Sequence, residues 1–355
     1  MIDVFCNVID NFGDAGFSLR LSRTLTKENY NVCLYCDNID TLNKIISKDD
    51  QENSKLTIKP WPQASEYQPA KIVIEAFSCR IPDPLTKLLK ENHSLVIELD
   101  YLTAEKFAED CHGLSSSSDG LNSYFFFPGF TQKTGGLIFE DELKHKVEAK
   151  NKEEITASTC IHATLFSYEN EKIKEIVSNL NNSNIPVEIA VYEGKPLENV
   201  NKQYPSLILK IGDKAKLGNI EFHAIPMTDQ SGYDDRLIAS DFNMIRGEES
   251  AVRGMLCGKP FLWHIYPQDE NAHIVKLNAL FDRMIDELPA TLHQDIEIIR
   301  AFNLEYNGVK TNYKFPSIIE FLPRWIHVTH AWSEHLFSLG SLTTNLKQFI
   351  QSKGY

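Results

Sequence analysis

The chain has 355 residues, which favours two domains over one, and 42% of its residues are hydrophobic, enough for packed cores. A net charge of −13 argues against a protein built to hold nucleic acid through its phosphates. There is no apolar run of the roughly 18 to 20 residues that a membrane helix needs, and Met1 leads straight into a short apolar run without the pattern of a signal peptide.

Seven cysteines are scattered along the chain in an odd number and without the spacing of a disulfide framework. This usage predicts a reducing, cytoplasmic setting. Cys33 and Cys36 have CxxC spacing, but no second pair completes a zinc site. We therefore expect both thiols to be buried in a strand rather than to bind metal or carry redox chemistry.

Short apolar runs alternate with polar helical stretches in the first half of the chain. Strands are predicted at residues 2–8, 32–35, 72–74 and 95–98, and helices at residues 16–27, 39–48 and 84–92. This alternation predicts a parallel sheet with helices on both faces. The charged stretch at 144–154 is typical of a linker or a solvated helix.

The pattern then restarts, with strands predicted at residues 161–166, 187–190, 207–211, 220–224, 242–245 and 261–265. Residues 333–351 have apolar positions at helical spacing and are predicted to form a final helix that folds back on the first domain. The expected fold is α/β, with two Rossmann-like domains at 1–150 and 156–330 and the returning helix at 331–355. Two doubly wound halves describe the GT-B architecture as well as any two-domain Rossmann enzyme.

Residues 246–250 (RGEES) are the most informative motif of the chain. They follow an apolar run and open a helix-like stretch that ends before Gly258. The start of a helix has backbone N–H groups without intrahelical partners, and these can bind phosphate. Arg246 and the Ser250 hydroxyl add further donors, so the motif predicts an anion site.

A second motif lies at the carboxyl end of the first predicted strand, where open α/β sheets bind ligands. Asp10 and Asp14 are four residues apart there, ahead of a helix. Asp14 could cap the helix and Asp10 could shape the turn, and spacing alone favours these structural roles. The glycines do not form GxGxxG, and an acidic loop would repel a pyrophosphate but attract a cation such as a guanidinium.

Eight motifs between about residues 2 and 280 resemble, in order, those of the elongation factor P arginine rhamnosyltransferase family (EarP). They lie at 10–16, 74–77, 101–105, 125–130, 134–136, 165–168, 246–250 and 263–268. The resemblance implies a GT-B fold with two domains facing across a cleft, the first for the acceptor protein and the second for the nucleotide sugar. It also implies that L-rhamnose is transferred from dTDP-β-L-rhamnose to an arginine of elongation factor P, with inversion at the anomeric carbon. No metal or cofactor is expected to take part, and no nucleic acid or membrane is expected to bind.

The family's functional residues can be matched to this chain one at a time. Asp10, Asp14 and Glu248 match its essential acidic residues. The expected substrate contacts are Asn11, Phe12 and Gly13 in the first loop, Phe166, Tyr168 and Gln230 at the thymine nucleoside, and Arg246, Ser250 and Tyr266 at the diphosphate. Gly247 and Glu249 are also expected to bind substrate. Two positions depart from the family pattern: Glu249 stands where an aspartate is usual, and Met227 where an aromatic residue is expected.

The residue types suit the chemistry that the resemblance implies. A guanidinium becomes acidic as its nitrogen attacks the sugar, so Asp14 is the expected general base and Asp10 the orienting partner. Arg246, Ser250 and Tyr266 could stabilise the leaving diphosphate without a metal. Glu248 could bind sugar or ribose hydroxyls, or hold its own loop.

Other classes remain open at this point: a nicotinamide-dependent oxidoreductase, a non-catalytic module that binds a translation factor, and a transferase for another nucleotide sugar. Three further residues are given structural roles. Asp234 and Asp235 are predicted to lie on a solvated helix face, and His264 is predicted to be a hydrogen-bonded core histidine.

Overall fold

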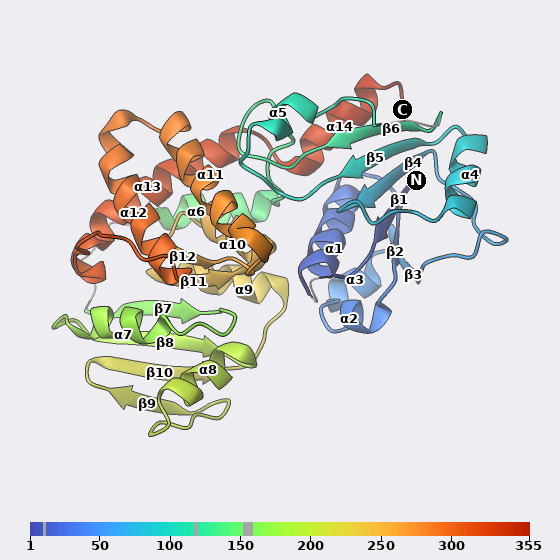
Figure 1. The fold of residues 1–355 in the computed structure, drawn as a ribbon. Coiled ribbons are helices and arrows are strands. Elements are labelled where there is room, and N and C mark those ends of the chain that lie inside the picture. The colour runs from blue at the N-terminus through green and yellow to red at the C-terminus, as the bar shows by residue number, and fades with distance from the viewer. Residues whose placement is uncertain (10–11, 117–119, 152–158) are drawn as a thin grey trace. The chain divides into compact units, whose positions relative to one another are not determined.

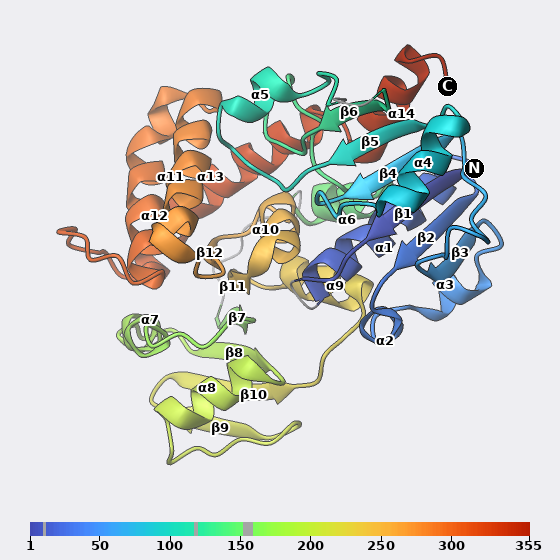
Figure 2. The same ribbon diagram turned by 45° about the vertical axis from the view of Figure 1, so that its right-hand side comes forward.

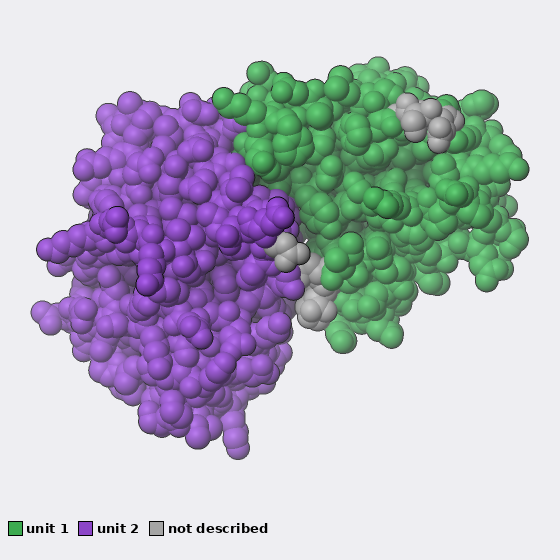
Figure 3. Space-filling model, in the orientation of Figure 1, with its two compact units in different colours: residues 1–140, 339–355 green, residues 141–338 purple. Residues whose placement is uncertain are grey.

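The computed structural model describes residues 1–9, 12–116, 120–151 and 159–355. Two parallel-rich sheets, each flanked by helices, organise the chain (Figure 1). They belong to two compact units, Met1–Glu140 with Leu339–Tyr355, and Asp141–Ser338 (Figure 3). The sequence ranges placed residues 141–150 in the first domain and 331–338 in the final helix, whereas the structure groups both segments with the second unit.

The first sheet consists of six strands: β1 (Ile2–Cys6), β2 (Val32–Cys36), β3 (Leu56–Pro60), β4 (Ile72–Ala76), β5 (Leu95–Leu99) and β6 (Asn122–Phe126). Their order is β3-β2-β1-β4-β5-β6, and every neighbouring pair is parallel. The direction of winding reverses between β1 and β4. In doubly wound sheets, ligands bind beside the carboxyl ends of the strands at such a reversal.

Successive strand residues point to opposite faces of the first sheet, and each face has its own core. Val4 packs on the side of α1 (Phe12–Lys27) and α14 (Leu342–Ser352), whereas Phe5 packs on the side of α4 (Asp83–Glu91; Figure 2). Leu346 of α14 is fully buried in the first of these cores. The predicted return of the C-terminal helix to the first domain is therefore confirmed.

The single helix predicted at 39–48 is wrong. The structure has two short helices there, α2 (Ile39–Asn43) and α3 (Lys48–Glu52). Ser47 caps α3 by accepting a hydrogen bond from the Asp50 amide, while the Asp50 carboxylate accepts one from the Ser47 amide. This capping box starts a new helix where the apolar spacing alone suggested a continuous one.

The second sheet consists of β7 (Ile161–Leu165), β8 (Val187–Tyr192), β9 (Lys214–Leu217), β10 (Ile220–Ile225), β11 (Phe242–Arg246) and β12 (Phe261–His264). Their order is β12-β11-β7-β8-β10-β9, with only β9 antiparallel among these strands. The winding reverses between β7 and β11, so the two loops that follow these strands leave the sheet side by side.

The strand predicted at 207–211 is wrong. Among its apolar residues, only Leu209 is buried, with less than a tenth of its surface exposed. Ile208 is 67% exposed and has a left-handed backbone, with φ of 33°. The chain turns at Lys210 and Asp213, and β9 then forms from the next residues and pairs with β10. This short apolar run thus forms a largely exposed loop, anchored by Leu209, rather than a strand.

Helices surround the second sheet: α6 (Asp141–Asn151), α7 (Ile173–Asn181), α8 (Lys195–Gln203), α9 (Gln230–Ala239), α10 (Gly247–Leu256), α11 (Ala272–Glu287), α12 (His293–Tyr306) and α13 (Ile318–Ser338). Helices α11, α12 and α13 lie together in both ribbon views (Figures 1 and 2). Within the described ranges, α5 (Phe107–Cys111) and two short 3-10 turns, Asp269–Asn271 and Ala290–Leu292, complete the helical elements. None of the helices that the structure describes has the length and apolar character to cross a membrane.

The segment predicted as one helix at 333–351 is divided between α13 and α14. Gly340, with φ of +81°, interrupts it. In the first unit, the Leu342 amide donates to the Leu137 carbonyl at 2.8 Å, and the Asn345 side chain donates to the Gly135 carbonyl at 3.0 Å. A Cβ at Gly136 would lie 2.7 Å from the Gly340 carbonyl oxygen, so the close approach of these two segments requires glycine.

We expect Asp3→Asn to stabilise the protein at neutral pH. Asp3 is fully buried, and one of its oxygens accepts hydrogen bonds from the Tyr67 hydroxyl and the Ala70 amide, both at 2.9 Å. Burial raises the pKa of Asp3 despite these bonds, so the folded state takes up this proton more readily than the unfolded state. The free energy of unfolding therefore rises as the pH falls through the folded pKa.

The asparagine keeps an oxygen for both donors and removes the buried charge. Chemical denaturation at pH 7 should show a gain of about 1 kcal/mol, which should vanish at acid pH where Asp3 is already protonated. A loss of stability at pH 7 would contradict this account.

Candidate functional site

The reversal of the second sheet brings three of the predicted residues together. Phe166 and Tyr168 follow β7, and Arg246 ends β11 beside it. The guanidinium carbon of Arg246 lies 4.4 Å from the Phe166 ring centroid and 4.8 Å from that of Tyr168. These are cation–π distances, so the loops after β7 and β11 meet in one cluster.

The turn from β11 into α10 depends on Gly247. Its φ is +65°, and a Cβ there would lie 3.2 Å from the Tyr168 hydroxyl. The Trp263 indole donates to the Gly247 carbonyl at 2.7 Å and fixes the turn from the side of β12. The turn therefore opens α10 with its first amides at the carboxyl edge of the sheet, and places Glu248, Glu249 and the buried Ser250 in the first helical turn.

Tyr266 and His264 complete this side of the site. Tyr266 is 56% exposed, and its ring stands edge-on to Tyr168 at 5.3 Å. His264 is buried, as predicted for a core histidine, and lies 5.5 Å from Tyr168; its Nδ1 has no hydrogen-bond partner in the described part of the chain. Burial, then the charges of Arg246 and His273, lowers the pKa of His264 to about 4, so its imidazole is neutral at neutral pH.

Two tyrosines that the sequence reasoning missed pack around Phe166. Tyr192 ends β8 and Tyr233 lies in α9, with ring centroids 5.3 Å and 5.4 Å from Phe166. Gln230 begins α9, which Asp229 caps by accepting from the Gly232 amide at 2.8 Å. The position of Tyr192 at the carboxyl end of a strand was a signal that could have found it.

A buried ion pair ties α9 to α10. Arg253 is fully buried, and its Nε and Nη2 donate to the two oxygens of Asp234 at 2.9 Å and 2.6 Å. The prediction that Asp234 lies on a solvated face is wrong, whereas the neighbouring Asp235 is exposed and pairs with Lys146. Adjacent helical residues point about 100° apart, so one of the two acidic side chains enters the core.

In the first unit, Asp14 lies in the first turn of α1 and is buried. Its Oδ2 accepts a hydrogen bond from the Ile9 amide at 2.8 Å, and the Cys6 thiol donates to its backbone carbonyl at 3.6 Å. Asp14 therefore holds Ile9, a residue before α1, which is a structural role different from the helix cap that its spacing suggested. Gly13 is half-buried on the same helix, while Asp10, Asn11 and the side chain of Phe12 lie outside the described residues.

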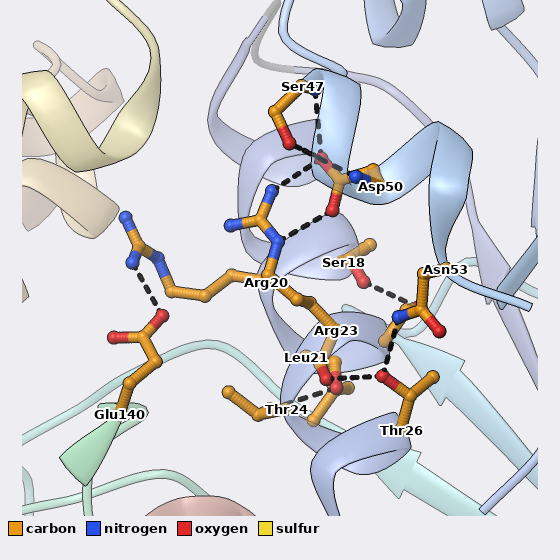
Figure 4. Close-up of polar contacts among 11 residues, drawn as sticks. Ser18, Arg20, Leu21, Arg23, Thr24, Thr26, Ser47, Asp50, Asn53 and Glu140 are labelled. Atoms are coloured by element: carbon orange, nitrogen blue, oxygen red, sulfur yellow. Dashed lines mark hydrogen bonds and ion pairs between the residues drawn. The ribbon is translucent and has the colours of Figure 1, made fainter. Parts of the chain in front are cut away.

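Two ion pairs anchor the helix that carries Asp14 (Figure 4). Arg20 is buried and donates to Glu140 at 2.7 Å. Arg23 makes two parallel bonds to Asp50, each 2.7 Å long. Bidentate pairs of this kind fix orientation as well as position.

The structure thus places Asp14 in the first unit and the Arg246 cluster, Glu248 included, in the second. Among the residues it describes, no three His, Cys, Asp or Glu side chains are grouped so that they could hold a metal ion. Cys33 and Cys36 are buried free thiols in β2, as predicted.

Known proteins resemble this chain along nearly its whole length. The family model described as Elongation-Factor P (EF-P) rhamnosyltransferase EarP matches residues 2–351. Proteins named protein-arginine rhamnosyltransferase from Shewanella oneidensis and Pseudomonas aeruginosa are 32% and 31% identical, over 98% of this chain and 97% and 98% of their own.

Solved structures show the same fold. One, from work on the structural basis for EarP-mediated arginine glycosylation of translation elongation factor EF-P, has a TM-score of 0.63 at 20% identity over 99% of this chain and 98% of its own. Acinetobacter baumannii MurG has a TM-score of 0.55 at 8% identity over 99% of both chains. The fold is therefore the α/β fold of GT-B glycosyltransferases, as expected.

We expect Asp234→Ala to destabilise the second unit strongly. It would leave Arg253 charged and without its bidentate partner in a fully buried position, a change that typically costs about 3–5 kcal/mol. Urea denaturation should show this loss in the free energy of unfolding. Replacing both residues, as in Asp234→Leu with Arg253→Met, should recover most of the lost stability. An Asp234→Ala variant as stable as the parent would show that the ion pair does not stabilise the packing of α9 on α10.

Proposed function

Because the chain belongs to the family of elongation factor P rhamnosyltransferases, we propose that it transfers L-rhamnose from dTDP-β-L-rhamnose to an arginine side chain of elongation factor P, with inversion at the anomeric carbon. The family and the GT-B fold make it a protein-arginine rhamnosyltransferase. The observation that carries the donor assignment is the cluster of Arg246, Phe166 and Tyr168 at the reversal of the second sheet. We place the reaction in the cytoplasm, where translation factors act.

The second unit offers what a nucleoside diphosphate sugar needs. Phe166 and Tyr168 would stack on a thymine base once Arg246 leaves their rings for the diphosphate, with Gln230 as an amide for the polar edge of the base. Arg246, the first amides of α10, the Ser250 hydroxyl and the exposed Tyr266 supply donors to the diphosphate. These groups stabilise the negative charge that develops as the diphosphate leaves, so we propose that no metal is required.

The acceptor chemistry falls to Asp14. A guanidinium is protonated and delocalised, and its attacking nitrogen becomes acidic only as it loses conjugation. The nitrogen forms a bond to C1 of the sugar, the bond from C1 to the phosphate oxygen breaks, and dTDP leaves. We assign the released proton to the Asp14 carboxylate, whose hydrogen bond from the Ile9 amide fixes its orientation, and the holding of the guanidinium to Asp10.

Glu248 has a different place in the proposal. It stands in the first turn of α10, where a carboxylate beside a diphosphate is unfavourable. We assign it to hydroxyl groups of the sugar or ribose, or to the amides of its own loop. Glu249 follows in the same turn and adds to this acidic side, while Gly247 allows the turn itself.

The reaction is tested by the intact mass of elongation factor P. Incubation with dTDP-β-L-rhamnose should add one deoxyhexose, and UDP-glucose or GDP-mannose should add nothing. An acceptor Arg→Lys variant should stay unmodified.

Asp14→Asn should slow transfer roughly 10²- to 10⁴-fold while the factor still binds. Transfer at the parent rate would refute the base assignment, and transfer from another donor only would refute the sugar.

Arg246 gives a second prediction, because in this structure its guanidinium covers the rings that a base would use. Arg246→Met should bind dTDP about 10- to 100-fold more weakly, through the lost charge-assisted bonds. The same variant should bind thymidine at least as tightly as the parent, since no cation must leave the rings. Calorimetry with both ligands measures this, with Arg324→Met on α13 as the control. Equal weakening for both ligands would show that Arg246 does not favour the diphosphate.

A further inference from the structure

Two motifs of the sequence have no role in the site described so far, and they meet in the first unit. Phe77 directly follows β4, and Tyr101 comes two residues after β5. Their rings are stacked, with centroids 4.5 Å apart and planes 17° from parallel. Phe17 of α1 packs on Phe77 from 4.8 Å. We call Phe17, Phe77 and Tyr101 the aromatic platform.

The platform lies at the reversal of the first sheet. β4 pairs with β1 on one side and with β5 on the other, all parallel, so the loops after these strands leave the same edge. Phe17 stands three residues after Asp14 on α1, which places both side chains on one face of the helix. The aromatic platform and the Asp14 carboxylate therefore belong to the same edge of the sheet.

The backbone after β4 is held in an unfavourable conformation. Phe77, Ser78 and Arg80 have φ values of 56°, 51° and 53°, in the left-handed region that costs non-glycine residues free energy. Two hydrogen bonds oppose that cost: the Phe77 amide donates to the Leu99 carbonyl at 2.6 Å, and the Ile81 amide to Glu75 at 3.0 Å. The surrounding structure thus fixes Phe77 in a position that its own backbone does not favour.

The exposure of the two stacked rings argues against packing as their sole role. Phe17 is buried, but Phe77 and Tyr101 are only partly buried, although the core of the first sheet lies directly beneath them. A strained turn that only completed a core would be expected to bury its ring. Here it leaves a stacked pair of rings at a ligand-binding edge, near a carboxylate.

We propose that Tyr101, supported from behind by Phe77, presents the ring face on which the guanidinium group of the acceptor arginine stacks. This rests on the proposed function and adds the acceptor subsite to it. A guanidinium is planar and weakly hydrated, and it stacks on aromatic faces while its N–H groups point sideways to a carboxylate. An ammonium group is a compact, strongly hydrated charge without such a plane. The platform therefore selects arginine over lysine and orients the nitrogen toward Asp14.

The test is Tyr101→Leu, with Tyr101→Phe as the conservative variant. Tyr101→Leu should raise the KM for elongation factor P about 3- to 30-fold, with little change in the KM for dTDP-β-L-rhamnose. Tyr101→Phe, which keeps the ring, should have the same KM for elongation factor P as the parent. Phe107→Leu, at an aromatic side chain that is 49% exposed on the same unit, should leave both constants unchanged. Thermal unfolding of all variants separates a lost contact from a lost fold.

Binding of unmodified elongation factor P, measured by calorimetry without any sugar donor, gives a readout that is independent of the proposed donor. The parent should bind the arginine form more tightly than an Arg→Lys form, and Tyr101→Leu should reduce this difference. An unchanged difference in folded Tyr101→Leu would overturn the platform, even if rhamnose transfer is observed. If no transfer is observed but the difference falls as expected, the platform stands and the donor assignment fails.

Discussion

The buried charge of Arg253 is the constraint on which the second unit of this protein depends. A guanidinium wholly removed from water is tolerated only when a carboxylate neutralises it in good geometry, and Asp234 does so with two hydrogen bonds. Because the partners lie on α9 and α10, the pair fixes the helix that begins at Gln230 against the one that begins at Gly247. The groups assigned to the base and those assigned to the diphosphate are thereby kept in one register.

The two sheets use one construction to gather groups of opposite charge. In each, the winding reverses beside the first strand of the unit, and the loops on either side of the reversal carry the site. In the second unit the reversal gathers Arg246 and helix amides, which suit an anion. In the first it gathers Asp14 and partly buried aromatic rings, which suit a cation. The fold supplies the edge, and the loop residues decide the charge of what binds there.

The sequence carried most of the architecture because buried parallel strands are short apolar runs, and those of β1, β2, β7 and β11 were placed to within a residue or two. It also placed Arg246 and Gly247 correctly in a turn between a strand and a helix, since a polar stretch with glycine between an apolar run and a helical pattern is a local signal. Local sequence patterns gave wrong or incomplete predictions where contacts with residues distant in sequence determine the position of a side chain. The burial of Asp234 depends on Arg253, and the role of Tyr192 depends on strands that are neighbours only in the folded sheet. The apolar run around Leu209 has the composition of a strand, but most of it is not buried, and pairing with β10 begins only at Lys214.

The return of α14 to the first unit affects the order in which the protein can be completed during synthesis. The second unit is continuous in sequence, whereas the first needs residues 339–355, which are synthesised after the whole of the second unit. Until then, the apolar surface that Leu342, Leu346 and Ile350 cover stays open on the nascent chain. The first unit is therefore finished only after the second has been made in full, and a chain without this helix would expose the core beneath α1 to water and to other chains.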